Sequence, residues 1–355
     1  MDMSTTNRAR FGARRRLRYL AVAAALVIAL AGCGDDDGAE VRDIGEETSA
    51  SGSGSASGSG SGSGTGSGSG PASASGSASG SATGISTEGL EDSTDDPLVA
   101  AAIEGYAGYL DEQVAEMIAA TTMFTDAVRA GDLEAARAAF APSRVAWERI
   151  EPIAGLIEAI DGAVDARVDD FAGPDDPAFT GWHRLEHILF ELDTTEGAAG
   201  FADQLDADLQ TLSQELASLE LPPAALAIGA AELVEEVSQG KITGEEDRYS
   251  KTDLWDFGAN LEGSQQIIQL LTPALTEAEP QLLADIQGGF EELFTTLEPL
   301  RDGDGWVLYC AADDQYPSDR CSEVTVDAAT LDVLKAQLAG LSENVSLVAG
   351  ALGLQ

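Results

Sequence analysis

The sequence predicts an all-α protein whose helices pack as bundles, preceded by a signal peptide and a disordered Gly/Ser linker. From about residue 95 onward, apolar residues recur at spacings of three and four, which is the pattern of amphipathic helices. No stretch of alternating apolar and polar residues lasts long enough to predict a sheet. About eight long periodic segments follow one another with short connections, and such segments bury their apolar faces by packing helix against helix.

The amino terminus has the features of a lipoprotein signal peptide over residues 1–32. Six arginines precede the apolar stretch Leu20–Ala31, which is too short to span a bilayer comfortably and is typical of a signal peptide. The stretch ends in Leu30-Ala31-Gly32-Cys33, which resembles the bacterial lipobox. We therefore expect lipidation of Cys33; the alternative is an unprocessed amino-terminal anchor helix.

Residues 33–94 are expected to form the lipidated amino terminus and a disordered tether. Ser49–Gly84 consists almost wholly of Ser, Gly, Ala and Thr, with one proline, Pro71. Such a segment has nothing to bury and stays disordered, with a root-mean-square span of roughly 30–36 Å. This arrangement predicts an extracytoplasmic domain, residues 95–355, that a lipid anchor holds to the cell membrane.

The net charge is −43, and removal of residues 1–32, with six arginines and one aspartate, would make it −48. Nucleic acid is excluded as a partner because binding it requires a basic surface. A strongly negative field concentrates cations in clefts, although an acidic surface that merely keeps the protein soluble is the alternative.

If Cys33 is lipidated, Cys310 and Cys321 remain, and in an oxidising compartment we expect them to form a disulfide.

The helices can be placed in order from their caps and breaks. Asp96-Pro97 begins the first helix with a capping side chain and a proline at its first position. Gly131-Asp132 ends that helix and caps the second, which is expected to run toward Ile160 through two prolines. Pro177 is expected to open the helix that carries the histidines. Further helices are expected at about 199–219, 223–239, 245–271, 277–300 and 327–350, with a turn at 302–305.

The two histidines of the chain stand four residues apart, in His183-Arg184-Leu185-Glu186-His187. On a helix, residues i, i+3 and i+4 share one face, so two imidazoles and a carboxylate would meet there. This pattern matches the inverted zinc-peptidase signature, in which both histidines hold zinc and the glutamate activates water. The alternative is a helix whose histidines lie in a polar seam between helices.

Two acidic segments could complete a metal site. Glu148 and Glu151 are neighbours at i and i+3 just before Pro152, and like charges so close are destabilising unless a cation or an arginine intervenes. An acidic turn follows, with carboxylates at Asp165, Asp169 and Asp170. Solvated surface carboxylates are the alternative for both segments.

A third acidic segment is spaced as the face of one helix. Glu246, Tyr249, Asp253 and Asp256 are three, four and three residues apart, and the apolar run around Trp255 indicates that the face is partly buried. Buried carboxylates need arginines, hydrogen-bond donors or a metal as partners. A purely structural salt-bridge network therefore remains an alternative, with candidate arginines at Arg149, Arg167, Arg184 and Arg248.

Three motifs in this order resemble the imelysin (M75 peptidase-like) family, and within it the EfeO/EfeM-type iron-uptake lipoproteins. They are APSRVAWERIEPIA at 141–154, TGWHRLE at 180–186 and KITGEEDRYSKTDLWDF at 241–257. The resemblance covers nearly all of residues 95–355. It implies two packed helical-bundle halves and a metal site centred on Gly181, His183 and Glu186. It also implies two partners, a membrane iron permease and a haem-dependent peroxidase of the same uptake system.

The resemblance leads to the following assignment of roles. His183 and Glu186 are expected to ligate the metal directly, together with Glu148 and one of Asp165, Asp169 and Asp170. Residues expected to orient these ligands are Glu151, Tyr249, Asp253, Asp256 and Arg149.

The family motif does not include His187, and a site dominated by oxygen ligands suits iron better than zinc. The sequence is thus interpreted as a lipid-anchored, extracytoplasmic iron-binding protein that delivers iron, as Fe²⁺ or Fe³⁺, to a membrane permease and is not an enzyme. The alternative is a zinc metallopeptidase that uses His183, Glu186 and His187. A third hypothesis, a module that binds acidic polysaccharides, is disfavoured by the acidic surface.

Overall fold

The structure is a computed structural model that describes residues 90, 91 and 93–354. The predicted signal peptide, the lipidation site Cys33 and nearly all of the Ser/Gly tether lie outside the described residues. The boundary of the folded domain at residue 95 stays a prediction.

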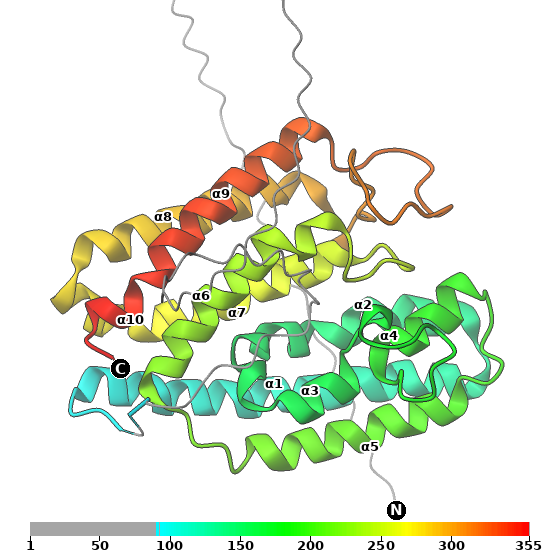
Figure 1. Ribbon diagram of the computed structural model, residues 1–355, viewed down its shortest axis with the longest axis horizontal. Coiled ribbons are helices and arrows are strands. Elements are labelled where there is room, and N and C mark those ends of the chain that lie inside the picture. The colour runs from blue at the N-terminus through cyan, green and yellow to red at the C-terminus, as the bar shows by residue number, and fades with distance from the viewer. Residues whose placement is uncertain (1–89, 92, 355) are drawn as a thin grey trace, which may run out of the picture. The chain divides into compact units, whose positions relative to one another are not determined.

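The described residues form two packed groups of helices (Figure 1), as the sequence predicted. The first group contains α1 (Pro97–Ala130), α2 (Leu133–Ile150), α3 (Glu158–Val164), α4 (Gly181–Glu186) and α5 (Ala199–Leu216). The second contains α6 (Pro223–Gln239), α7 (Asp253–Ala278), α8 (Pro280–Leu297), α9 (Ala328–Ser346) and the short α10 (Val348–Ala351). The groups meet where α7 packs against α1 and α2.

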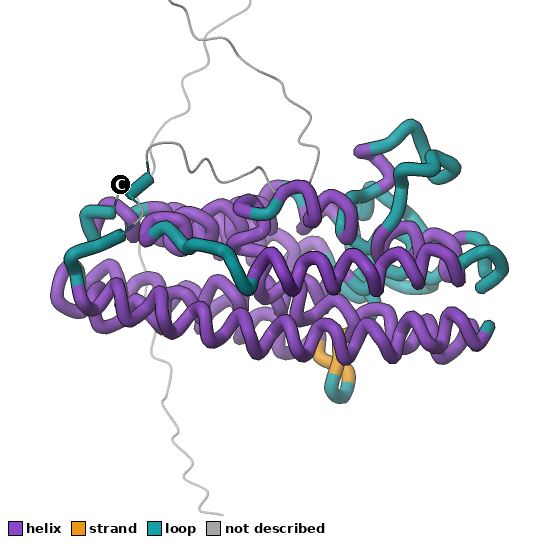
Figure 2. Tube along the Cα trace, turned by 90° about the horizontal axis from the view of Figure 1, so that it is seen from below, coloured by secondary structure: helices purple, strands orange, loops and turns teal. Residues whose placement is uncertain are grey.

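Short elements connect these helices. Four are 3₁₀-helices and one, η3, is a π-helix: η1 (Glu151–Leu156), η2 (Val168–Asp170), η3 (His187–Glu191), η4 (Lys241–Thr243) and η5 (Glu298–Leu300). Figure 2 shows the long helices lying side by side, with a small hairpin projecting from them. The hairpin pairs β1 (Arg301–Asp302) with β2 (Gly305–Trp306), so the turn expected at 302–305 is confirmed.

The caps predicted for the first two helices are present. The Asp96 carboxylate accepts a hydrogen bond from the Leu98 amide at 2.8 Å, and Pro97 occupies the first position of α1. Gly131 ends α1 with φ +72°, and the Asp132 carboxylate caps α2 through the Ala135 amide at 3.1 Å. These side chains satisfy amides that have no partner inside a helix, which is why the helices begin at these residues.

Two predicted helix starts were wrong. The helix that carries the histidines begins at Gly181 and not at Pro177, because Thr180 is extended and Gly181 has φ +76°. The segment 245–252 is not helical, and α7 begins at Asp253. Lys251 has φ +63°, a conformation that no helix continues through. The third acidic segment, Glu246 to Asp256, therefore does not form one face of a single helix.

The second predicted helix also stops early, at Ile150, and continues as the 3₁₀-helix η1. Pro152 has no amide hydrogen to donate to an α-helical bond, which explains the change. Just before this break, α2 and α7 lie very close: a Cβ on Gly263 of α7 would be 2.1 Å from the Arg149 carbonyl oxygen. This close approach brings the acidic residues of the two helices together in the interior.

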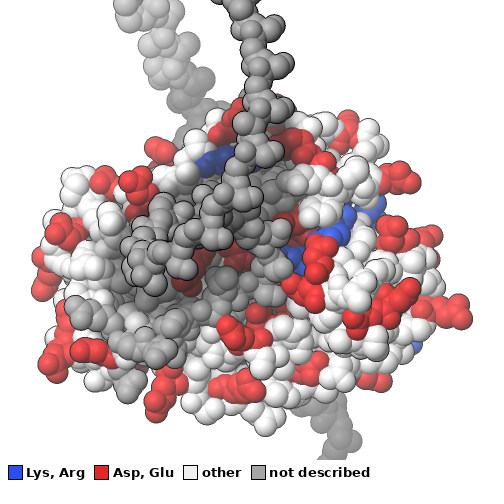
Figure 3. Space-filling model, viewed as in Figure 1, with Lys and Arg blue, Asp and Glu red and all other residues white. Residues whose placement is uncertain are grey.

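Acidic side chains are spread over the face of the molecule seen in Figure 3, and basic ones are few.

A disulfide joins Cys310 to Cys321, whose Cα atoms are 5.5 Å apart. No helix among the described residues combines the length and the apolar character needed to cross a membrane.

Candidate metal centre

Helix α4 is anchored by its first two residues. A Cβ on Gly181 would lie 2.1 Å from the Val164 carbonyl oxygen, so only glycine fits both this contact and the positive φ. The next residue, Trp182, is fully buried and packs against Trp147 of α2, with ring centroids 6.2 Å apart. These contacts fix the position of His183, which is 2% exposed.

Four carboxylates surround the His183 ring. Its Nδ1 lies 3.1 Å from Glu186 Oε2 and 3.9 Å from Asp247 Oδ1. Its Nε2 lies 3.5 Å from both Asp165 Oδ1 and Glu246 Oε1. Within each of two groups, Asp165–His183–Glu246 and His183–Glu186–Asp247, one atom from every residue lies within 4.8 Å of the others. We call these five residues the His183 cluster.

Backbone and indole donors hold the carboxylates of the cluster in place. Glu186 Oε1 accepts hydrogen bonds from the amides of Tyr249 and Ser250 at 2.9 and 2.7 Å. Asp165 Oδ2 accepts a hydrogen bond from Trp147 Nε1 at 2.9 Å. In the loop before α7, the amides of Tyr249 and Ser250 therefore donate to Glu186 and not to helical hydrogen bonds. This loop conformation places Glu246 and Asp247 next to His183.

Buried cations compensate part of the negative charge. Arg144, fully buried on α2, pairs with Asp165 and Glu148 and lies 3.3 Å from Glu246. Arg167 pairs with Glu246 on its other side. Buried charges persist when they are paired in this way.

Lys241 neutralises the acidic pair Glu148 and Glu151. Its Nζ lies 2.7 Å from Glu151 and 3.2 Å from Glu148. Asn260 of α7 donates to both carboxylates, at 2.9 Å to Glu148 and 2.7 Å to Glu151. Glu148 and Glu151 thus already have a cation and an amide donor, and they lie beside the His183 cluster and not against the imidazole.

The carboxylates still outnumber the cations in this interior. Burial, followed by the charge of Asp247, raises the pKa of both Asp253 and Asp256 well above the usual range. Burial also raises the pKa of Asp247, to about 6. Burial and Arg144 lower the pKa of His183, but the neighbouring carboxylates of Asp165, Glu186 and Glu246 outweigh them and raise it. Protons balance this excess negative charge, and a metal cation could replace them.

Within the described part of the chain, several buried polar atoms have no hydrogen-bond partner and are free to ligate a cation. His183 Nε2 and Asp247 Oδ1 are buried without a hydrogen-bond partner among the described residues, as are Oδ2 of Asp253 and Asp256. Such atoms are rare in folded proteins and call for a ligand or a water. One imidazole with several carboxylates suits a hard or borderline cation such as iron better than a soft one.

The structure brings some predicted site residues together and separates others. His183, Glu186 and Asp165 meet in the cluster, with Glu148, Glu151, Asp253 and Asp256 beside it. Asp169 and Asp170 are exposed, and Asp169 pairs with Arg248. Arg149 pairs with Glu262 at 2.9 Å.

His187 does not join either group of possible ligands among the described residues. It begins the π-helix η3, and its ring packs edge-on against that of Tyr249, with centroids 5.1 Å apart. Burial, followed by the charge of Arg184, lowers its pKa. An inverted zinc-peptidase site requires both imidazoles on one metal. Although His183 and His187 are spaced i, i+4, the described residues do not group them as ligands of one ion.

Glu246 and Asp247 were not assigned as ligands from the sequence. A helix over 245–252 would place Glu246 on one face with Tyr249, whereas the segment that is present brings Glu246 to His183. The sequence signal for the turn is Gly244, and in the structure this glycine has φ +78°, which belongs to a turn and not to a helix interior. Glycine is among the strongest sequence signals of a turn or a helix break.

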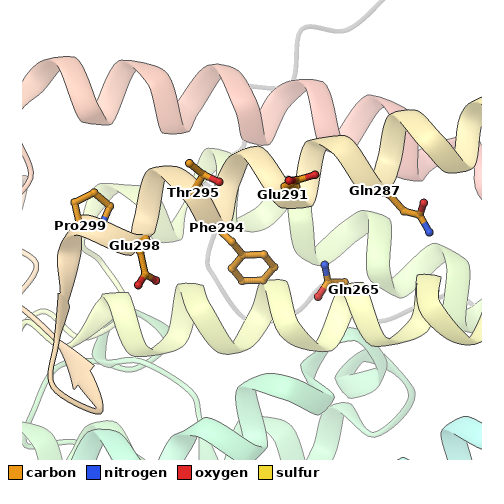
Figure 4. A pocket seen from close by; sticks show the side chains of 7 residues that line it. All are labelled: Gln265, Gln287, Glu291, Phe294, Thr295, Glu298 and Pro299. Carbon is orange, nitrogen blue, oxygen red and sulfur yellow. The ribbon is translucent and has the colours of Figure 1, made fainter. Parts of the chain in front are cut away.

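A groove between α7 and α8 offers a different kind of surface (Figure 4). Amide and carboxylate side chains surround Phe294 there, and the lining contains no residue of the His183 cluster. Both groups of possible metal ligands among the described residues lie in the His183 cluster and none lies in this groove, so the cluster is the stronger candidate for metal binding.

Comparison with known proteins agrees with the family resemblance seen in the sequence motifs. The family model described as Imelysin matches residues 102–342. The chain is 44% identical over 257 residues to a protein of Escherichia coli O157:H7 named "Iron uptake system component EfeO". It is 43% identical to proteins of the same name from Escherichia coli K12 and Shigella flexneri. Each match covers 72% of this chain and 65% of the relative, so the chain spans less than two thirds of their length.

Proposed function

The chain belongs to the imelysin family, and from this premise we propose that it is an extracytoplasmic, lipid-anchored iron-binding component of an iron uptake system. The observation that supports the proposal most is His183, buried among Asp165, Glu186, Glu246 and Asp247 with an unpartnered Nε2. The relatives named as iron uptake components make iron the preferred cation.

The donor set suits a protein that takes up its cargo and releases it. Iron as Fe²⁺ or Fe³⁺ would be held by His183 and by the carboxylates of the cluster, with Arg144 and Arg167 limiting the net negative charge. Glu186 is fixed by two backbone amides, so it would act as a ligand already in place. Iron would then pass to a membrane permease, with a haem-dependent peroxidase as a further partner and Cys33 as the membrane anchor.

The proposal is tested by iron calorimetry on the full chain purified in detergent. His183→Ala should weaken iron binding by more than about 100-fold, because loss of an outer partner alone costs roughly 10–100-fold. Glu246→Gln and Glu186→Gln should each weaken it as well. His187→Ala, which removes the same side chain four residues away, should leave the affinity within about threefold of wild type.

A zinc metallopeptidase predicts the opposite order of effects. His187→Ala would then lose the metal as severely as His183→Ala, and Glu186→Gln would keep the metal and lose peptide hydrolysis. That result would replace the proposed function by an enzymatic one.

A further inference from the structure

A pocket of about 490 Å³ lies beside the His183 cluster and has a different chemical character. One wall is formed by Phe190 and Glu191 at the end of η3 and by Arg248 and Tyr249 of the loop before α7. The other wall is residues 316–320, inside the loop that the Cys310–Cys321 disulfide closes. Sites for small organic ligands have volumes of roughly 300–1,000 Å³, whereas a bare metal ion needs no such space.

The pocket combines arginines and phenols in a protein with few cations. Arg248 lies over the Tyr316 ring, 4.4 Å from its centroid, and pairs with Asp169. Arg320 forms no ion pair with any carboxylate that the structure describes, and one hydrogen bond, from its Nε to the Ser250 carbonyl at 3.1 Å, orients it. Its guanidinium also lies over Phe190, at 4.8 Å. An arginine held in this way presents its free N–H groups to an incoming anion.

The pocket and the His183 cluster share one short segment of chain. Asp247 belongs to the cluster, and Arg248 directly after it lines the pocket. The Tyr249 amide donates to Glu186, and the Ser250 carbonyl accepts from Arg320. A ligand in the pocket would therefore lie next to the residues that hold the ligands of the proposed iron site.

The lining also contains two exposed carboxylates, Glu191 and Asp319. They would weaken the binding of an isolated anion, and they favour a ligand that carries a cation as well. Resting on the proposed function, we propose that the pocket binds a carboxylate of a small organic-acid chelator that arrives together with the iron. Arg320 is its main partner, and the phenols of Tyr249 and Tyr316 are additional donors.

Equilibrium dialysis of the full chain against ferric citrate tests this inference, with radioactive iron and carbon-labelled citrate as the two probes. Wild type should retain both labels. Arg320→Gln should retain about tenfold less citrate, because it loses a charge-assisted hydrogen bond, and Arg320→Lys should recover part of the loss. Lys335→Gln removes an exposed charge on α9 and should retain citrate as wild type does. Circular dichroism checks that each variant is folded.

The outcomes separate this inference from the proposed function. Retention of iron without citrate by wild type, or equal citrate retention by Arg320→Gln and wild type, would refute the chelator pocket and leave the iron site standing. If wild type retains neither label and also fails to retain uncomplexed Fe²⁺, both proposals are refuted.

Discussion

Replacement of Gly181 by alanine should destabilise the fold and displace His183. Gly181 has φ +76°, which costs an L-residue about 1–2 kcal/mol. The added Cβ would also lie 2.1 Å from the carbonyl oxygen and 2.5 Å from the carbonyl carbon of Val164, so backbone must move. Forced movement of this kind costs about 1–3 kcal/mol, which gives a total of about 2–5 kcal/mol.

The measurement is urea unfolding of iron-free protein, followed by circular dichroism, with iron calorimetry on the fraction that stays folded. Gly340→Ala is the matched control, because Gly340 lies inside α9 and a Cβ there would meet nothing within 4 Å. That change should leave stability equal or raise it by up to about 1 kcal/mol. A Gly181→Ala midpoint equal to wild type, with unchanged iron affinity, would refute the role assigned to this glycine.

Three further changes test other parts of the molecule. Lys241→Met should destabilise the fold by about 3–5 kcal/mol, since it leaves Glu151 buried without its cation and Glu148 with Arg144 alone; a urea midpoint like that of wild type would contradict this. Burial, followed by the charge of a neighbouring carboxylate, raises the pKa of Asp161 to about 8. The folded state then keeps a proton that the unfolded state loses above pH about 4, so stability should fall as pH rises toward 8. Asp161→Asn should remove this contribution, and identical pH profiles of unfolding would refute it. Finally, Cys33→Ser should abolish fatty-acid labelling and release the protein from membranes; membrane retention without label would indicate an uncleaved anchor helix.

Local spacing accounts for the parts of the site that the sequence identified. His183 and Glu186 are three residues apart on one short helix, so their contact at 3.1 Å follows from helix geometry alone. The helical class and the caps of α1 and α2 also follow from residues that lie within one turn of each other.

The other carboxylates could not be chosen from spacing. The acidic turn offered Asp165, Asp169 and Asp170 as equal candidates, and the structure places Asp165 against His183 and the other two at the surface. The difference arises because Trp147 and Arg144 of α2 hold Asp165 in the interior. Neither partner is close to it in sequence.

The sequence by itself determined the helical class, the negative charge, the pairing of His183 with Glu186 and the family motifs. Tertiary structure decided which distant acids reach the imidazole, and it turned His187 toward Tyr249. Glu246 and Asp247 arrive through a loop whose amides bind Glu186. Helical periodicity relates residues only within a few positions, whereas the distance between two chain segments depends on how all the elements between them pack.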